Sequence, residues 1–125
     1  MVFGQTVEIK LVNGRNGHPL ANSHVNVWLG AKQRDALALP TDQNGIAHLN
    51  LADNDGSLRI NVPYVLCQPH TPDYSWLAIM TFSADEVLQK GVVRPNACGK
   101  VTEPRQPGEV TIFVRPLTWW EKFKQ

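Results

Sequence analysis

The clearest prediction of fold class comes from Thr6-Val7-Glu8-Ile9-Lys10-Leu11-Val12, in which apolar residues recur at every second position. In an extended strand this spacing gives one apolar face, while Thr6, Glu8 and Lys10 lie on the other. Residues 13–17, which follow, are rich in Asn and Gly, and these tolerate the left-handed backbone of tight turns. We therefore expect a half-buried strand that ends in a turn.

The same alternation recurs further along the chain, with turn residues between the segments. It is found in residues 24–29, 46–51, 57–62 and 109–115. In the last segment, Val110, Ile112 and Val114 alternate with a second set that includes Thr111 and Phe113. Strands at this spacing predict an all-β fold, an antiparallel sandwich, rather than βαβ units.

Four segments are less regular. Residues 31–39 are expected to form a loop and a short strand, and residues 63–72, with their prolines, an irregular or edge segment. Residues 75–81 are apolar and strand-like, with Trp76 in the core. Residues 93–108 are rich in Pro, Gly and polar residues, which predicts an extended loop anchored at Cys98.

One short helix is expected, at residues 84–90. Ser83 and Glu86 form a capping box, in which the hydroxyl accepts from the Glu86 amide and the Glu86 side chain returns to the cap amide. Gly91 then supplies the left-handed residue that ends the helix.

Length and charge narrow the classes of function. The 125 residues fit a single domain, residues 1–125, with an aromatic tail at 116–125. Twelve Lys and Arg against eleven Asp and Glu give a net charge of +1, so we expect no basic face and no nucleic-acid partner. No run of eighteen apolar residues is present, so no transmembrane segment is expected.

The first residues bear on the compartment. Val2-Phe3-Gly4 before Gln5 resembles the end of a cleaved secretory leader. Residues 1–5 are therefore interpreted as a leader remnant with Met1 added, and the protein as secreted, periplasmic or on the cell surface. A genuine cytosolic start at Met1 is the alternative.

Two cysteines, Cys67 and Cys98, are expected to form one disulfide. The bond would close a loop of about thirty residues and stabilise the fold by about 3 kcal/mol. A zinc site needs more ligands than the neighbouring sequence offers, and neither cysteine lies in a nucleophile motif.

Motifs in the first half of the chain resemble a known family. They are Gly17-His18-Pro19-Leu20, Val25-Asn26-Val27-Trp28, Thr41-Asp42-Gln43-Asn44-Gly45-Ile46-Ala47 and Ile60-Asn61-Val62. Together they resemble carboxypeptidase regulatory-like domains, which belong to the transthyretin-like (prealbumin-like) β-sandwiches. Residues 91–93, 96–99 and 107–109 resemble, more weakly, small secreted bacterial proteins of this kind. The resemblance implies a Greek-key sandwich of about seven strands and a non-catalytic binding or structural module.

Enzymes with this type of sandwich depend on particular residues, and the chain lacks those of two such classes. Hydroxyisourate hydrolases need a Tyr-Arg-Gly-Ser-like ending, where this chain has Trp119-Trp120-Glu121-Lys122. Domains with an internal Lys–Asn isopeptide bond need a buried Lys, whereas Lys10 lies on the polar face of its strand and residues 109–115 contain no Asn. Neither activity is expected.

An intradiol-type iron dioxygenase is the remaining enzymatic alternative. It would use Tyr64, Tyr74 and His70, which cluster in the sequence, but the H-x-H arrangement of that family is absent. The Asp-rich turns lack the distal Glu of a calcium loop. We therefore expect no catalytic residues, metal or cofactor.

Tryptophans are the best candidates for contact with a ligand. Trp28 is either in the core or, by alternation with Val27, directed outward. Trp119 and Trp120 are adjacent and cannot both be buried on one strand face, so one ring either seals a sheet edge or contacts a partner. The alternative function is therefore a glycan- or cell-envelope-binding module that stacks sugar rings on exposed Trp. The expected partner is an unidentified protein or glycan.

Overall fold

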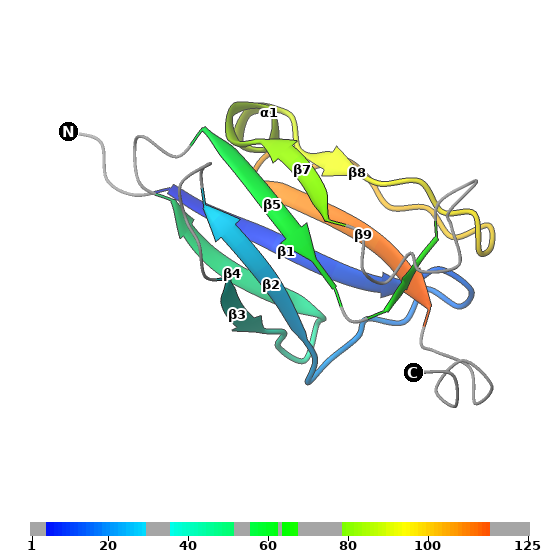
Figure 1. The fold of residues 1–125 in the computed structure, drawn as a ribbon. Coiled ribbons are helices and arrows are strands. Elements are labelled where there is room, and N and C mark those ends of the chain that lie inside the picture. The colour runs from blue at the N-terminus through cyan, green and yellow to red at the C-terminus, as the bar shows by residue number, and fades with distance from the viewer. Residues whose placement is uncertain (1–4, 30–35, 52–55, 63, 68–78, 116–125) are drawn as a thin grey trace.

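The computed structural model describes residues 5–29, 36–51, 56–62, 64–67 and 79–115. Within these ranges lie nine strands and one helix (Figure 1). They are β1 (Gln5–Asn13), β2 (His24–Leu29), β3 (Leu37–Pro40), β4 (Ile46–Leu51), β5 (Ser57–Asn61), β6 (Val65–Leu66), β7 (Met80–Ser83), α1 (Ala84–Gln89), β8 (Val92–Val93) and β9 (Glu109–Arg115). About seven strands were expected, and two of the nine observed, β6 and β8, have only two residues each.

The strands form two sheets that pack as a sandwich (Figure 1). Sheet A has the order β4-β1-β9-β6, with β8 also paired to β9, and sheet B has the order β3-β2-β5-β7. Sheet B is antiparallel throughout, as expected. Sheet A is mixed, because β9 runs parallel to both β1 and β8. The prediction of a purely antiparallel sandwich is therefore wrong for these two pairings.

The core lies between the sheets and is built from the predicted apolar faces. Val7, Ile9 and Leu11 of β1 and Val25 and Val27 of β2 are fully buried in one cluster. Alternate residues of β4, β5 and β9 complete it. Burial of each such side chain contributes about 1.5–3 kcal/mol, so the period-two pattern is also the main source of stability.

The short helix α1 ends where the sequence predicts. The Ser83 hydroxyl accepts a hydrogen bond from the Glu86 amide at 3.4 Å. Gly91 has φ of +78°, and its amide donates to the carbonyls of Glu86 and Val87. A Cβ at Gly91 would lie 2.0 Å from the carbonyl oxygen of Gln106, so the position excludes a side chain as well as favouring a left-handed backbone.

Two irregular segments can be compared with their predictions. β7, Met80–Ser83, overlaps the strand expected at residues 75–81 at its last two positions and continues to Ser83, which both ends this strand and caps α1. Residues 75–78, with Trp76, lie outside the described residues. The edge segment expected in 63–72 is represented by β6, which lies at the end of sheet A.

A long segment crosses the outer face of sheet A and gives it a second buried layer. We call this segment, residues 94–108, the strap; it begins after β8 and returns to β9 (Figure 1). Val12, Cys67 and Phe113 form a small apolar cluster beneath it, joined by Val101. Thr111 is 0% and Phe113 2% exposed, so the half-buried strand predicted for residues 109–115 is buried on both faces.

The far end of the strap is held by the backbone. The Gly108 amide donates to the carbonyl of Val87 at 2.7 Å, and the Glu8 amide donates to the carbonyl of Gly108 at 2.8 Å. The strap is thus tied to both α1 and β1. In the part of the chain that the structure describes, no helix is long and apolar enough to cross a membrane.

Candidate functional site

The near end of the strap is held by the predicted disulfide. Cys67 and Cys98 are bonded, with their Cα atoms 5.2 Å apart. Cys67 is buried next to β6, and its amide donates to the Phe113 carbonyl at 2.9 Å. The bond therefore joins the strap to the edge of sheet A rather than closing a surface loop on itself.

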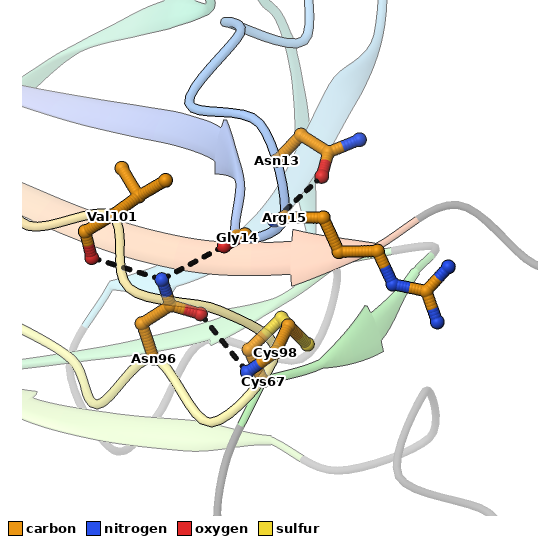
Figure 2. Close-up of a disulfide and its surroundings, with 7 residues drawn as sticks. All are labelled: Asn13, Gly14, Arg15, Cys67, Asn96, Cys98 and Val101. Carbon is orange, nitrogen blue, oxygen red and sulfur yellow. Dashed lines mark hydrogen bonds between the residues drawn. A yellow bond between two sulfur atoms is a disulfide. The ribbon is translucent and has the colours of Figure 1, made fainter.

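Asn96 fixes the strap beside this bond (Figure 2). Its side-chain Nδ2 donates to the carbonyls of Gly14 and Val101, both at 2.9 Å. Its Oδ1 accepts from the Cys98 amide at 3.1 Å. One amide side chain thus links the turn after β1 to two positions of the strap, and backbone groups that would otherwise lack partners are satisfied.

Gly14 is required where the strap meets the turn. A Cβ at this position would lie 2.4 Å from Oδ1 of Asn96 and 2.8 Å from Sγ of Cys67. The turn therefore approaches the disulfide closely enough to exclude any side chain. The sequence marked Gly14 only as a turn residue, so this packing role was not predicted.

Two hollows flank the middle of the strap, and together we call them the strap groove. One, of about 300 Å³, lies between the strap and β8–β9, and the other, of about 350 Å³, lies between the strap, β1 and the neighbouring turns. The first is lined by Val93, Arg94, Asn96, Gly99, Lys100, Val101, Thr102, Glu103 and Phe113, and the second by Lys10, Val12, Gly17, Pro19, Asn44, Ile46 and Glu103. Glu103 belongs to both hollows.

An ion pair spans the strap groove. Nζ of Lys10 lies 3.4 Å from Oε1 of Glu103, and both side chains are mostly buried, with 25% and 20% exposed. Lys10 lies on the polar face of β1, as predicted. Glu103 was not singled out by the sequence, because its partner is distant along the chain and no local pattern connects them.

Arg94 lines the first hollow, but its guanidinium is directed elsewhere. Its Cζ lies 5.9 Å from the centroid of the Phe82 ring, a cation–π contact within the edge of the sandwich. Partial burial lowers the pKa of Arg94 below its ordinary value. The guanidinium of Arg94 is therefore in contact with the Phe82 ring and partly withdrawn from water.

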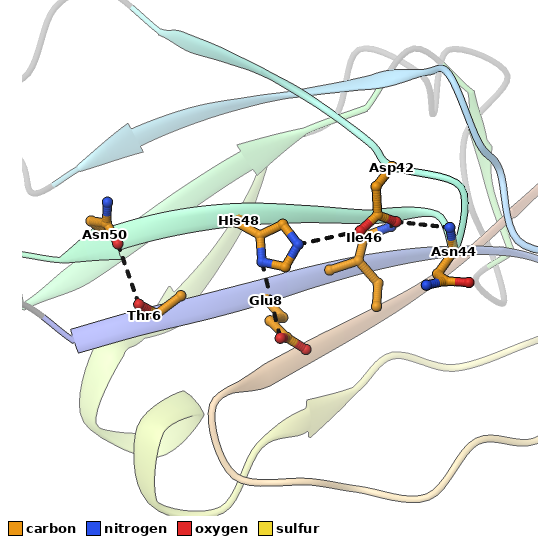
Figure 3. A network of polar contacts seen from close by, with 7 residues as sticks. All are labelled: Thr6, Glu8, Asp42, Asn44, Ile46, His48 and Asn50. Atoms are coloured by element: carbon orange, nitrogen blue, oxygen red, sulfur yellow. Dashed lines mark hydrogen bonds and ion pairs between the residues drawn. The ribbon is translucent and has the colours of Figure 1, made fainter.

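A polar ladder occupies the other end of the outer face of sheet A (Figure 3). Nε2 of His48 lies 3.3 Å from Oδ2 of Asp42, and its Nδ1 lies 4.0 Å from Oε1 of Glu8. Beside them, Thr6 Oγ1 donates to Oδ1 of Asn50 at 3.3 Å. The His48 side chain is 55% exposed, so these contacts lie at the surface.

Asp42 organises the turn that leads into β4. Its Oδ1 accepts from the amides of Asn44, at 2.8 Å, and Ile46, at 3.1 Å. The hydrogen bonds from Ile46 and Asn44, with a smaller effect of His48, hold the pKa of the Asp42 carboxyl below its ordinary value of 3.8. Among the described residues, no group of three His, Cys, Asp or Glu side chains is arranged to hold a metal ion.

Trp28 is the one predicted ligand-binding residue that lies within the described ranges. It alternates with the buried Val27 and is therefore directed outward from sheet B, where it is partly buried. Cζ of Arg59, its partner across the strands, lies 5.8 Å from the ring centroid. The neighbouring pair on this face is Asn26 and Asn61, with Nδ2 of Asn26 3.4 Å from Oδ1 of Asn61. Trp119 and Trp120 lie outside the described residues.

Of the predicted iron ligands, only Tyr64 is described. Its hydroxyl lies 2.6 Å from Oγ of Ser23, and the ring packs against the main core. His70 and Tyr74 lie outside the described residues. The one polar contact of the Tyr64 hydroxyl that is observed joins β6 to the turn before β2.

No protein-family model matches the chain, and no curated protein matches its sequence.

Proposed function

We propose that the protein is a non-catalytic, secreted binding module of the carboxypeptidase regulatory-like type. The observation that carries this proposal is the strap groove, which lies between a sheet and a strap held at both ends. A wall fixed by a disulfide and by Asn96 loses little conformational entropy when a ligand binds, so such a groove favours recognition.

The family and compartment in this proposal rest on the sequence motifs together with the general architecture. A two-sheet sandwich is what the motifs imply, and we propose that its connections follow the Greek-key order of the transthyretin-like family. A disulfide is more common in oxidising compartments than in the cytosol, which supports secretion.

The test is a titration of the ¹⁵N-labelled protein with panels of peptides and oligosaccharides, followed by ¹H–¹⁵N spectra. We expect at least one ligand to shift the amide signals of Glu103, Val101 and Lys10 together, because these residues border one groove. The ligand recovered afterwards should be unchanged. Conversion of a ligand to product, or silence of these signals across both panels, would contradict the proposal.

A glycan-binding module is the second candidate, and a different face favours it. Trp28 presents part of an indole ring on sheet B, next to the planar amides of Asn26 and Asn61. Aromatic rings and amides are the groups that pack on and hydrogen-bond to sugar rings. We expect oligosaccharides to quench Trp fluorescence in the wild type and to do so less in Trp28→Ala. Quenching of equal size in this variant would remove Trp28 from the site, and no quenching by any glycan would remove the candidate.

A further inference from the structure

We propose that the strap groove binds an extended peptide segment of a partner protein, one that alternates apolar and acidic side chains. This inference rests on the proposed function, because it names the ligand class of the same groove.

The floor of the strap groove is apolar in both hollows. Val93 and Val101, both partly exposed, line one, and the partly exposed Ile46 and the exposed Pro19 line the other, while Phe113 and Val12 are already buried beneath the strap. Hollows of about 300 and 350 Å³ hold one or two side chains each. Apolar side chains that enter them would remove apolar surface from water at both places, which is the usual source of affinity in peptide grooves.

The charge of the groove is unbalanced at one end. Lys10 and Glu103 compensate each other, and among the described residues that line either hollow Glu103 is the only acid. Lys100 is exposed and forms no ion pair with any described residue. The backbone of Gly99 lies against that of Arg15, but the Arg15 guanidinium points away from the strap (Figure 2), so Lys100 supplies the exposed charge at this end. An acidic side chain on the ligand complements this end.

The two hollows favour a peptide over a glycan as the occupant. Glu103 lines both hollows and is paired with Lys10, so a ligand that fills both must place two separate side groups next to this residue. An extended peptide does this with every second side chain, and the acidic side chains between these stay at the exposed rim, where Lys100 lies. The floor also offers aliphatic groups and one phenylalanine rather than an open aromatic platform of the kind on which sugars stack.

The experiment uses three fluorescein-labelled, end-blocked hexapeptides and measures anisotropy with the oxidised protein. The first repeats Leu-Glu, the second Leu-Lys and the third Ser-Glu. We expect the Leu-Glu peptide to bind more tightly than either of the others, by about tenfold, and its affinity to fall as salt is raised. Equal binding of the Leu-Glu and Leu-Lys peptides, or of the Leu-Glu and Ser-Glu peptides, would overturn the inference.

Matched charge reversals locate the binding. Lys100→Glu should weaken the Leu-Glu peptide by about five- to tenfold, because it replaces attraction at the groove by repulsion. Lys90→Glu makes the same charge change at an exposed position after α1 and should have little effect. Equal effects of the two variants would show attraction to the whole protein instead of the groove, and would overturn the inference.

Failure of this inference can be separated from failure of the proposed function. If the Leu-Glu peptide does not bind but another ligand of the panels shifts the signals around Glu103, the groove binds a different class and only the peptide is wrong. If no ligand shifts them, both the peptide and the strap groove are wrong as the site.

Discussion

The two ends of the outer face of sheet A are built in opposite ways. At one end Val12 and Phe113 are apolar and lie beneath the strap, which is held by a disulfide and by the hydrogen bonds of Asn96. At the other end, Glu8 and His48 form the polar ladder, whose contacts are 3.3–4.0 Å long and exposed. The difference follows from side-chain chemistry, because an apolar face must be covered whereas a polar one can remain in water.

The two ends therefore differ in how well they tolerate substitution. Exposed ion pairs contribute about 0–1 kcal/mol each, so the polar ladder can change without loss of the fold. The strapped end combines a disulfide, buried groups that are hydrogen-bonded and a close approach of the backbone. A substitution there leaves buried groups without partners, and water cannot reach them as a replacement. A face with one rigid and one adaptable end is well suited to hold a ligand in the rigid part.

The largest expected effect comes from the disulfide. Replacing both Cys67 and Cys98 by Ser should lower the free energy of unfolding by about 2–5 kcal/mol in urea denaturation, because the unfolded chain regains the freedom of the closed loop. Hydrogen exchange should quicken first in the strap and later, or not at all, at the polar ladder. Equal acceleration at both ends would show that the strap has no separate role.

The disulfide itself is open to a direct check. Intact mass after alkylation should be unchanged without reductant and should show two alkyl groups after reduction, since both cysteines are in the bond. Two alkylated thiols in the unreduced protein would contradict the structure at this point.

The next effect tests the close approach at the turn. Gly14→Ala should destabilise the protein by about 1–3 kcal/mol, because the new methyl group must displace the Asn96 side chain and the disulfide. Gly56→Ala is the control, since a Cβ there meets no atom within 4 Å. We expect this control to change stability by no more than about 0.5 kcal/mol in the same denaturation experiment. Similar losses of stability in both variants would show that the loss comes from the restricted backbone of alanine and not from the contact with the strap.

A smaller effect is expected where the two ends meet, at the ion pair between Lys10 and Glu103. A double-mutant cycle with Lys10→Ala and Glu103→Ala should give a coupling of about 0.5–1 kcal/mol, the upper part of the range for surface pairs, because both side chains are mostly buried. The coupling should shrink at high salt. A coupling energy near zero at low salt would show that this ion pair contributes no more than the exposed contacts of the polar ladder and does not hold the strap.

The fold was predictable wherever one face of a strand is apolar. The alternation in β1, β2, β4 and β5 is a local property, and the turns between them have local signatures too. The cysteine pairing was predictable because only two cysteines exist. In each of these cases the information lies within a few residues or in a simple count.

The rest depends on contacts between distant parts of the chain. The parallel pairing of β1 with β9 joins residues about a hundred positions apart and leaves no local trace. The burial of Thr111 and Phe113 depends on the strap, which has no periodic pattern and therefore looked like a simple loop. For the same reason the sequence identified Lys10 as a residue of the polar face but not Glu103 as its partner, and the strap groove was not foreseen.

The smallest expected effect lies in the polar ladder and depends on pH. Because the pKa of folded Asp42 lies below the ordinary value of 3.8, its carboxylate stabilises the fold above that pH. This contribution is lost as the pH falls from 3.8 through the folded pKa. Asp42→Asn keeps an oxygen for the amides of Ile46 and Asn44 but removes the charge, so the variant should be less stable than the wild type near neutrality.

Urea denaturation between about pH 2.5 and 6 measures the difference in free energy of unfolding between the wild type and Asp42→Asn. This difference should be constant at the upper end of the range and should disappear as Asp42 is protonated. His48→Ala is the companion variant, because His48 lowers the Asp42 pKa less than the two backbone amides do. In this variant most of the pH dependence should therefore remain. If it disappears, the exposed ion pair and not the turn controls Asp42, and the polar ladder is more strongly coupled than its geometry implies.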